Sequence, residues 1–327
     1  MSELELLRGA MSQIAELAKS AAEGDGDRYG YGDCGNAEVS CIPKSLPERL
    51  WIKAAETARS INPVNAPFFG PMGDLGETIM DPLRIAVLTS KYWGAQLRRL
   101  TVSFMEATPL DLRARIISHL NAWSRTSGVT FVATNGVGQV RISRGSGGYY
   151  SYLGTDILRI PTNRQTMNLE RFTMSSPESE FRRVIRHEAG HTLGFPHEHM
   201  RRQLVARIDP EKAYDYFWRT QRWDRATVNA QVLTPLDDRT IFATPADQTS
   251  IMCYQLPGSI TFDGRPILGG NDINTTDFTF AGRIYPNGSR SMGLAARCEE
   301  EVDGIGMAAA ALGDDWSEDE DVEPESE

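Results

Sequence analysis

The sequence predicts an α+β fold in which helices pack on a small sheet, and two observations lead to this prediction. From about residue 91, short strand patterns alternate with amphipathic helix patterns. Apolar residues make up 40% and charged residues 24% of the 327 residues, a balance typical of a chain that buries a core. No apolar run is long enough for a membrane span, and four cysteines are too few for a disulfide scaffold.

The predicted elements follow one another in the first half of this domain. Residues 97–104 have a strand pattern, and the next helix is expected to start at Pro109 with Thr108 as its cap. Its apolar face is formed by Leu112, Ile116, Leu120 and Trp123. Two short strands are predicted at 129–133 and 140–143. A glycine-rich turn then opens a segment whose tyrosines either line a cleft or pack in the core: Tyr149, Tyr150 and Tyr152.

An N-terminal segment, residues 1–85, precedes the predicted domain at residues 86–290. Its first part has the pattern of one amphipathic helix, with apolar residues at Leu4, Leu7, Met11, Ile14, Ala18 and Ala21. Breaks rich in glycine, aspartate or proline follow at residues 24–36 and 63–76. Arg8, Glu16 and Lys19 interrupt the run that a secretory leader would need, so no conventional leader is expected.

The C-terminal tail, residues 291–327, carries most of the excess negative charge. Residues 299–327 contain thirteen acidic residues and no Lys or Arg, which leaves 31 acids against 34 bases in residues 1–298. The tail lacks apolar residues to bury, so we expect it to be disordered. It serves either to solubilise the chain or as a lid or partner-binding segment. We expect no nucleic-acid and no membrane partner for a chain of net charge −10.

Four of the five histidines fall within residues 187–199, in the pattern H-E-x-x-H-x-x-G-x-x-H. A helix that begins after Ser175 or Ser176 would place His187 and His191 on one face, close enough to share one Zn²⁺. Gly194 would end the helix and let the chain turn back, so that His197 supplies a third nitrogen. Three histidines with one open position indicate a catalytic zinc site and not a closed structural one.

The residues around these ligands have separate predicted roles. Glu188 lies beside the ligands, where it can reach a water on the ion and act as general base. His199 is expected to be exposed or to lie next to the ligands, and His119 is expected to be structural. Arg182, Arg183 and Arg186 are expected to be solvated or to form ion pairs on the active helix.

The eleven-residue motif resembles that of the metzincin zinc metallopeptidases, whose second mark is a methionine-containing turn below the metal. Residues 250–254, Ser-Ile-Met-Cys-Tyr, are similar to that turn. Phe195 and Glu198 around the third histidine resemble the astacin family of peptidases, as do residues 274–277 with 284–285. The resemblance covers residues 91–286. Gln203, Leu204 and Cys253 depart from the family pattern, and the two family disulfides are absent, which makes this a divergent member.

The resemblance implies a metzincin-type zincin domain with a small, twisted, mostly parallel sheet and an active-site helix. It implies one Zn²⁺ per chain, peptide or protein substrates, and Met252 as a hydrophobic base below the zinc. Tyr254 would be a switchable extra ligand that also stabilises the transition state. The expected function is zinc endopeptidase, and the family favours an extracellular location. A catalytically silent zinc scaffold, or a dedicated processing enzyme or toxin with a narrow substrate, remains the alternative.

Astacins are similar to one another in carrying an N-terminal segment that blocks the zinc, and residues 1–85 are predicted to be such a pro-segment. Asp74 follows Pro71, Met72 and Gly73, where the family has F-x-G-D. Cys34 is a second candidate, as a thiolate plug of the matrixin kind. The alternative is that Cys34 and Cys41 pair with each other or stay free. Removal of the segment would free a new N-terminus near Glu198.

Overall fold

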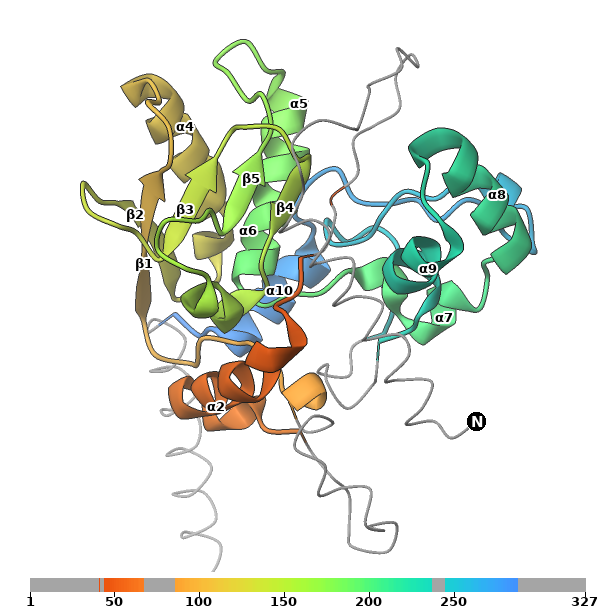
Figure 1. Cartoon of the computed structure of the whole chain (residues 1–327), viewed down its shortest axis with the longest axis horizontal. Coiled ribbons are helices and arrows are strands. Elements are labelled where there is room, and N and C mark those ends of the chain that lie inside the picture. Colours follow the sequence, from red (N-terminus) through yellow and green to blue (C-terminus); the bar gives the residue numbers. More distant parts are fainter. Residues whose placement is uncertain (1–40, 42–43, 68–85, 237–244, 288–327) are drawn as a thin grey trace, which may run out of the picture. The chain divides into compact units, whose positions relative to one another are not determined.

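The computed structural model describes residues 41, 44–67, 86–236 and 245–287. The predicted α+β class is confirmed, since one sheet is packed against helices (Figure 1). Several predictions lie outside the described residues, namely the N-terminal helix, the joint at 24–36, the acidic tail, Cys34 and Asp74. The boundaries at 85/86 and 290/291 also lie there, so the domain limits stay predictions. No helix of the described part is long and apolar enough to cross a membrane.

The sheet has five strands in the order β2-β1-β3-β5-β4. The bounds are Arg98–Phe104 (β1), Val129–Ala133 (β2), Val140–Ser143 (β3), Tyr149–Ser151 (β4) and Met167–Leu169 (β5). All neighbouring pairs are parallel except β4 with β5, so β4 is an antiparallel edge strand. Strand β3 is buried along its whole length, as expected for an inner parallel strand.

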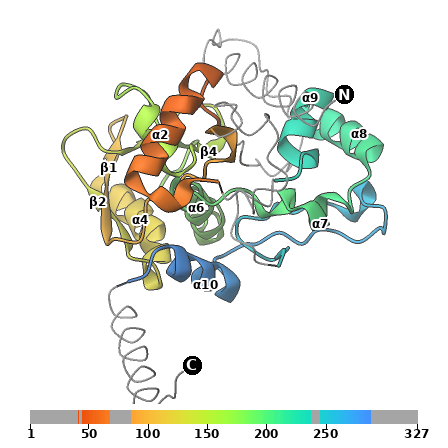
Figure 2. The ribbon, with the colours of Figure 1, turned by 90° about the horizontal axis from the view of Figure 1, so that it is seen from below.

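The described helices fall into two groups in space (Figure 2). The first comprises α2 (Trp51–Ile61), α4 (Leu110–Leu120), α5 (Glu178–Glu180), α6 (Arg186–Thr192) and α10 (Thr275–Ile284). A π-helical turn, Phe181–Ile185, joins α5 to α6 into one continuous helix. The second group comprises α7 (Arg202–Val205), α8 (Pro210–Gln221) and α9 (Arg225–Val228). Figure 2 shows this second group beyond the end of α6, away from the sheet.

Sequence patterns explain most of these helix positions, but not the caps of α4 and α5. Helix α4 buries Leu112, Ile116 and Leu120 at i, i+4 and i+8, as predicted. The predicted cap at Thr108 is wrong, because its hydroxyl donates to the Glu106 carbonyl. The caps predicted at Ser175 and Ser176 are also wrong, since Pro177 occupies the cap position and Ser176 Oγ accepts from the Thr173 amide.

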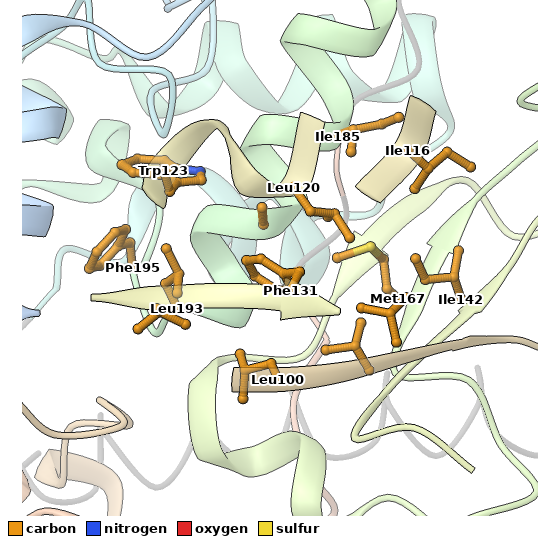
Figure 3. Close-up of a cluster of buried hydrophobic side chains, with 14 of the residues drawn as sticks. Leu100, Ile116, Leu120, Trp123, Phe131, Ile142, Met167, Ile185, Leu193 and Phe195 are labelled. Carbon is orange, nitrogen blue, oxygen red and sulfur yellow. The ribbon is translucent and has the colours of Figure 1, made fainter. Parts of the chain in front are cut away.

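The main core lies between the sheet and the helices α4 and α6. Leu100, Phe131 and Ile142 from the strands meet Ile116, Leu120, Ile185 and Leu193 from the helices (Figure 3). A second apolar cluster joins α8 and α9 to the loop that follows residue 253. The active helix is therefore held by the sheet on one side, which fixes the position of its side chains.

Residues 44–67 of the N-terminal segment pack on the same unit. Leu46, Ala54, Ala55 and Ala58 are buried, which gives α2 an apolar side. The side chain of Asn65 is fully buried and donates to the carbonyls of Ala58 (2.9 Å) and Tyr92 (2.7 Å). Asn65 Oδ1 accepts from the Tyr92 amide at 2.9 Å. The Asn65 side chain therefore binds both the backbone amide and the backbone carbonyl of Tyr92, ahead of β1.

Candidate active site

Three buried imidazoles meet at the C-terminal end of the active helix. His187 and His191 project from α6, and His197 comes from the loop that follows it. The Nε2 atom of His197 lies 3.1 Å from that of His187 and 3.0 Å from that of His191. The three predicted ligands are thus brought together with their Nε2 atoms facing one point.

The opposite ring nitrogens show which tautomer the ligands adopt. His187 Nδ1 lies 2.6 Å from the Ile251 carbonyl, and His191 Nδ1 lies 2.8 Å from the Phe195 carbonyl. A carbonyl oxygen accepts only, so the Nδ1 atoms of His187 and His191 carry the protons, and the Nε2 atoms of these two rings present lone pairs toward His197 Nε2. Burial lowers the pKa of His187 to about 4, which keeps the ring neutral.

Three imidazole nitrogens that converge on one point can hold a cation, and this donor set fits Zn²⁺. Tetrahedral zinc with bonds of about 2.0–2.1 Å to nitrogen places its ligand nitrogens roughly 3.3–3.4 Å apart. The Nε2 separations here are slightly shorter, and a small opening of the rings would accommodate the ion. A carbonyl partner for the second nitrogen is also typical of zinc-binding histidines.

Gly194 turns the chain so that the third imidazole returns to the helix. Its φ is +94°, a left-handed conformation that favours glycine. The Gly194 amide donates to His191 O (2.8 Å), and the Phe195 amide donates to Gly190 O (3.0 Å). Phe195 then packs against Trp123, with ring centroids 5.2 Å apart. The aromatic anchor and the glycine turn explain the spacing between the second and third histidines.

Glu188 points from the same helix with a fully buried carboxylate. Among the described residues, neither of its oxygens has a hydrogen-bond partner. Burial raises the pKa of Glu188 to about 8, with a smaller opposing effect of the neighbouring Cys41 thiol. A buried, unpartnered carboxylate beside three metal-ligand nitrogens is the arrangement expected of a proton acceptor that works on a bound water.

The Tyr254 ring packs against the imidazoles of His197 and His199. Its ring centroid is 4.3 Å from that of His197 and 4.2 Å from that of His199, against which it stacks. The hydroxyl is shielded from solvent and has no hydrogen-bond partner in the described part of the chain. His199 is fully buried and its Nε2 lies 2.9 Å from the Gln231 carbonyl. The exposed alternative for His199 is therefore wrong, and its position beside the ligands fixes the ring of Tyr254.

The methionine turn lies below the ligands, as the sequence pattern predicts. Met252 is buried, and a Cβ built at Gly190 would come within 2.4 Å of its sulfur. Asp277 of α10 holds the turn, since its carboxylate accepts from Ser250 Oγ (2.6 Å) and from the Ile251 amide (3.0 Å). The Ile251 carbonyl in turn contacts His187. Asp277 was not assigned this role from the sequence, where only its place in a helix-capping pattern is visible.

Glu198 lies in a small cavity behind the methionine turn. The cavity is lined by Tyr92, Trp123, Arg201, Asp247 and Phe280, among others. Glu198 Oε1 accepts from the Asp247 amide at 3.0 Å, and burial raises the pKa of this carboxyl to about 7. The predicted binding place for a new N-terminus is thus a partly enclosed, acidic cavity.

Cys41 is the site residue that the sequence did not identify. Its thiol is a free, buried group, and it forms a set of four ligand atoms with His187, His191 and His197, all within 4.8 Å of one another. Burial and the nearby Glu188 carboxylate raise the pKa of the Cys41 thiol well above its usual value. Cys34 and Asp74, the predicted blocking residues, lie outside the described residues. Cys41 can be identified only from its position in the fold, because no sequence spacing links it to the histidine motif.

The tyrosines after β3 both pack and border the site. Tyr149 contacts Phe172, with ring centroids 5.7 Å apart, and Tyr150 is buried beside Tyr152. The backbone of Cys41 forms a parallel β-bridge with Tyr149, and that of Lys44 forms one with Tyr152. These two residues of the N-terminal segment therefore lie along the free edge of β4. The edge strand and Tyr152 after it thus pair with Cys41 and Lys44 of this same chain.

Comparisons with known proteins match the part of the chain that carries this site. The model of the Astacin family of peptidases matches residues 88–259. A structure of myroilysin is 29% identical with a TM-score of 0.57, covering 62% of this chain and 98% of that chain. A second myroilysin structure is 31% identical with a TM-score of 0.47, covering 61% and 87%. A hatching enzyme, a zinc-protease of the medaka fish Oryzias latipes, is 22% identical with a TM-score of 0.37, covering 56% and 86%. Among curated proteins the comparison gave no match.

Proposed function

Because the chain belongs to the astacin family of metallopeptidases, whose model matches more than half of it, we propose that it cleaves internal peptide bonds with Glu188 as general base. The family makes it a zinc metalloendopeptidase, a hydrolase whose substrates are peptides or proteins. The resemblance seen in the sequence is thereby confirmed, and the assignment of individual residues is the proposal.

The observation that carries the proposal is the convergence of three buried Nε2 atoms beside the buried carboxylate of Glu188. His187, His191 and His197 would hold the zinc. When bound, the ion polarises a water and the substrate carbonyl and stabilises developing negative charge. Glu188 lies beside this site with a buried carboxylate, where it can interact with that water.

The chain's own residues then divide the remaining work. Glu188 takes a proton from the attacking water and returns it to the leaving amine as the carbon–nitrogen bond breaks. The Tyr254 hydroxyl, unpartnered within the described residues and close to His197, donates a hydrogen bond to the oxygen of the carbonyl under attack. The stacking of His199 on Tyr254 holds the ring in position for this role.

A zinc-binding scaffold without turnover is the alternative from another class. Loss of Glu188 would be expected first in such a protein, and both Glu188 and Tyr254 are present. A processing enzyme or toxin with a narrow substrate would use the same site, so it differs only in the peptides it accepts.

The cavity beside Glu198 supports the proposal that activation produces a new N-terminus, which then binds near Glu198. A new α-amino group produced by removal of the N-terminal segment, residues 1 to about 85, would carry a positive charge near neutral pH. The half-buried Glu198 carboxyl could pair with it, and its pKa would then fall from about 7. Full activity of a chain that still begins at Met1 would contradict this part of the proposal.

Digestion of a peptide library, read by mass spectrometry, tests the proposed function. The full chain and a chain trimmed by limited proteolysis are compared with their Glu188→Ala variants, whose zinc content is measured in parallel. We expect cleavage in the interior of peptides, a loss of about 10²–10⁴-fold in Glu188→Ala, and unchanged zinc. Glu180→Gln, on the same helix but in an ion pair with Arg183, is the matched control and should cleave normally. Retained cleavage by Glu188→Ala would overturn the assignment.

A further inference from the structure

The peptide group that contacts His187 is hydrogen-bonded on both of its sides. The Ile251 carbonyl accepts from His187 Nδ1 at 2.6 Å, and the Met252 amide of the same peptide group donates to Ser250 Oγ at 3.0 Å. The Ser250 hydroxyl donates its one proton to Asp277 Oδ1 at 2.6 Å. Three hydrogen bonds in series therefore lead from a metal-site histidine to a carboxylate on α10.

The three hydrogen bonds all point toward Asp277. The ring N–H, the peptide N–H and the hydroxyl each donate to the next group, so their dipoles are aligned. Asp277 Oδ2 also accepts from the amides of Ile251 and Asn274, each at 3.0 Å. Three donors thus face the two oxygens of this side chain, which is the pattern expected of an ionised carboxylate. The series therefore ends on a negative charge.

Burial lets this charge act on the His187 ring. His187, Ser250, Ile251, Met252 and Asp277 are all buried, so little solvent screens the interaction. In such surroundings, hydrogen bonds in series polarise one another. A carboxylate at the end draws the Nδ1 proton of the ring toward the Ile251 carbonyl, which leaves more electron density on Nε2. The Nε2 atom of His187 then becomes a stronger donor to a metal ion.

His191 offers an internal comparison on the same helix. Its Nδ1 lies 2.8 Å from the Phe195 carbonyl, but the residue that follows is Pro196, whose nitrogen carries no hydrogen. The peptide group that accepts from His191 therefore has no donor through which a series of this kind could continue. The two histidines thus differ in what lies behind the carbonyl that each one contacts.

We propose that Asp277 is a positioning residue of the metal site, which acts through Ser250 and the Ile251–Met252 peptide to strengthen His187 as a zinc ligand. This proposal rests on the proposed function, because it requires His187 to bind zinc. The bonds from Asp277 Oδ2 to backbone amides hold the methionine turn in place, whereas the bond from Ser250 Oγ transmits the charge. Loss of the Ser250 hydroxyl should therefore weaken zinc binding even where the turn stays folded.

Competition with a chromogenic chelator measures the zinc dissociation constant of the full chain and does not depend on activity. We expect this constant to rise by about 10–100-fold in Ser250→Ala and in Asp277→Asn, which keeps the side-chain shape and removes its charge. The double variant should bind zinc no more weakly than the weaker single variant, because both changes interrupt one series of bonds. Unchanged zinc affinity in both single variants, or fully additive losses in the double variant, would overturn the proposal.

Asn274→Ala is the matched structural control. Asn274 Oδ1 accepts from the Asp277 amide at 2.9 Å and caps α10, but its side chain lies outside the series. This variant should unfold more easily than wild type and bind zinc like wild type. An equal loss of zinc affinity in Asn274→Ala would show that the packing of α10, and not the charge of Asp277, supports the site.

Nuclear magnetic resonance of the zinc-bound full chain, labelled with nitrogen-15 in histidine, gives a readout that a purely structural role would not change. The proton on His187 Nδ1 should resonate further downfield than that on His191 Nδ1, because its hydrogen bond is backed by a charge. In Ser250→Ala and Asp277→Asn it should move upfield, while the His191 proton stays in place. A His187 proton that does not move in either variant would refute the proposal.

The outcomes separate this inference from the proposed function. If wild type binds zinc and cleaves peptides, and the Ser250 and Asp277 variants bind zinc equally well, this inference fails while the proposed function stands. If wild type binds no zinc, both fail.

Discussion

At the scale of single residues, the hydroxyl of Tyr254 is a polar group whose role can be isolated by removing one atom. It has no hydrogen-bond partner in the described part of the chain, and the ring is fixed by stacking on His199. Tyr254→Phe should therefore keep the ring and the zinc but lower kcat by about 10²–10³-fold, as for loss of an oxyanion donor. Steady-state kinetics on the trimmed chain would show this with KM little changed.

Tyr216→Phe is the matched control for that measurement, because Tyr216 lies on α8 and packs in the second apolar cluster. It should leave kcat unchanged. If Tyr254→Phe instead raised KM with normal kcat, Tyr254 would be a substrate-binding group and not a transition-state donor.

Local spacing explains why the histidines could be identified from the sequence and Cys41 could not. His187 and His191 are one helical turn apart, and Gly194 marks the turn that returns His197, so all three follow from short-range rules. Cys41 reaches the site only through its pairing with β4, which depends on the tertiary fold. Asp277 likewise has a visible helix-cap role, but its bonds to the methionine turn join residues distant in sequence.

A second residue-scale prediction concerns Asp156, whose pKa burial raises from 3.8 to about 6, opposed by Lys91 at 3.9 Å. The folded state holds this proton more tightly than the unfolded state, so its stabilising effect is full below pH 3.8 and is lost as the pH rises through about 6. The shift of about 2.2 units corresponds to roughly 3 kcal/mol. Urea unfolding of wild type and Asp156→Asn from pH 4 to 7 measures it.

In that experiment, the free energy of unfolding of wild type should fall by roughly 2 kcal/mol relative to Asp156→Asn, because part of the full effect already lies below pH 4. Parallel pH profiles for the two proteins would show that the Asp156 carboxyl titrates normally in the folded state.

At the scale of elements, the close contact between α6 and the methionine turn fixes the floor of the site. A Cβ at Gly190 would lie 2.4 Å from Met252 Sδ and 3.2 Å from Trp123 Cζ2. Gly190→Ala should lower the free energy of unfolding by about 1–3 kcal/mol, because the added methyl group would overlap Met252 and Trp123, which are both buried in the core. Urea unfolding of the metal-free protein measures this without the contribution of the ion.

Gly136→Ala is the control at an open loop, where the nearest atom to an added Cβ is Thr134 Oγ1 at 3.8 Å. It should unfold like wild type. Equal stability of the two variants would mean that Met252 moves freely below the zinc, contrary to the tight packing described here.

The elements themselves were predictable to different degrees. Strands β1, β2 and β3 and helix α4 follow from clear periodicity, and their bounds lie within a residue or so of the predicted ranges. Strand β5 has three residues and was not predicted, because so short a segment shows no period. The serine and threonine caps failed because proline takes the cap position in both helices. A residue type that favours the cap position does not show that the residue next to it is not the cap.

At the scale of the whole molecule, the described part of the N-terminal segment is a packed part of the structure. Helix α2 and Asn65 are bound to the unit that holds the zinc site, while Cys41 and Lys44 lie along β4. The sequence showed a break at residues 63–76 and so favoured a separate segment. Burial of Leu46 and Asn65 could not be read from it, since one is a lone apolar residue and the other is polar.

The central claim, that one zinc ion held by three histidines carries the peptidase activity, is tested most directly by zinc titration. The trimmed chain is stripped with a chelator, and hydrolysis of a fluorescent peptide is followed as zinc is added back. We predict no activity without metal, a linear rise, and a sharp end point at about one zinc per chain, since the three ligands form a single site. Full activity in the stripped protein, or an end point well away from one, would contradict the account.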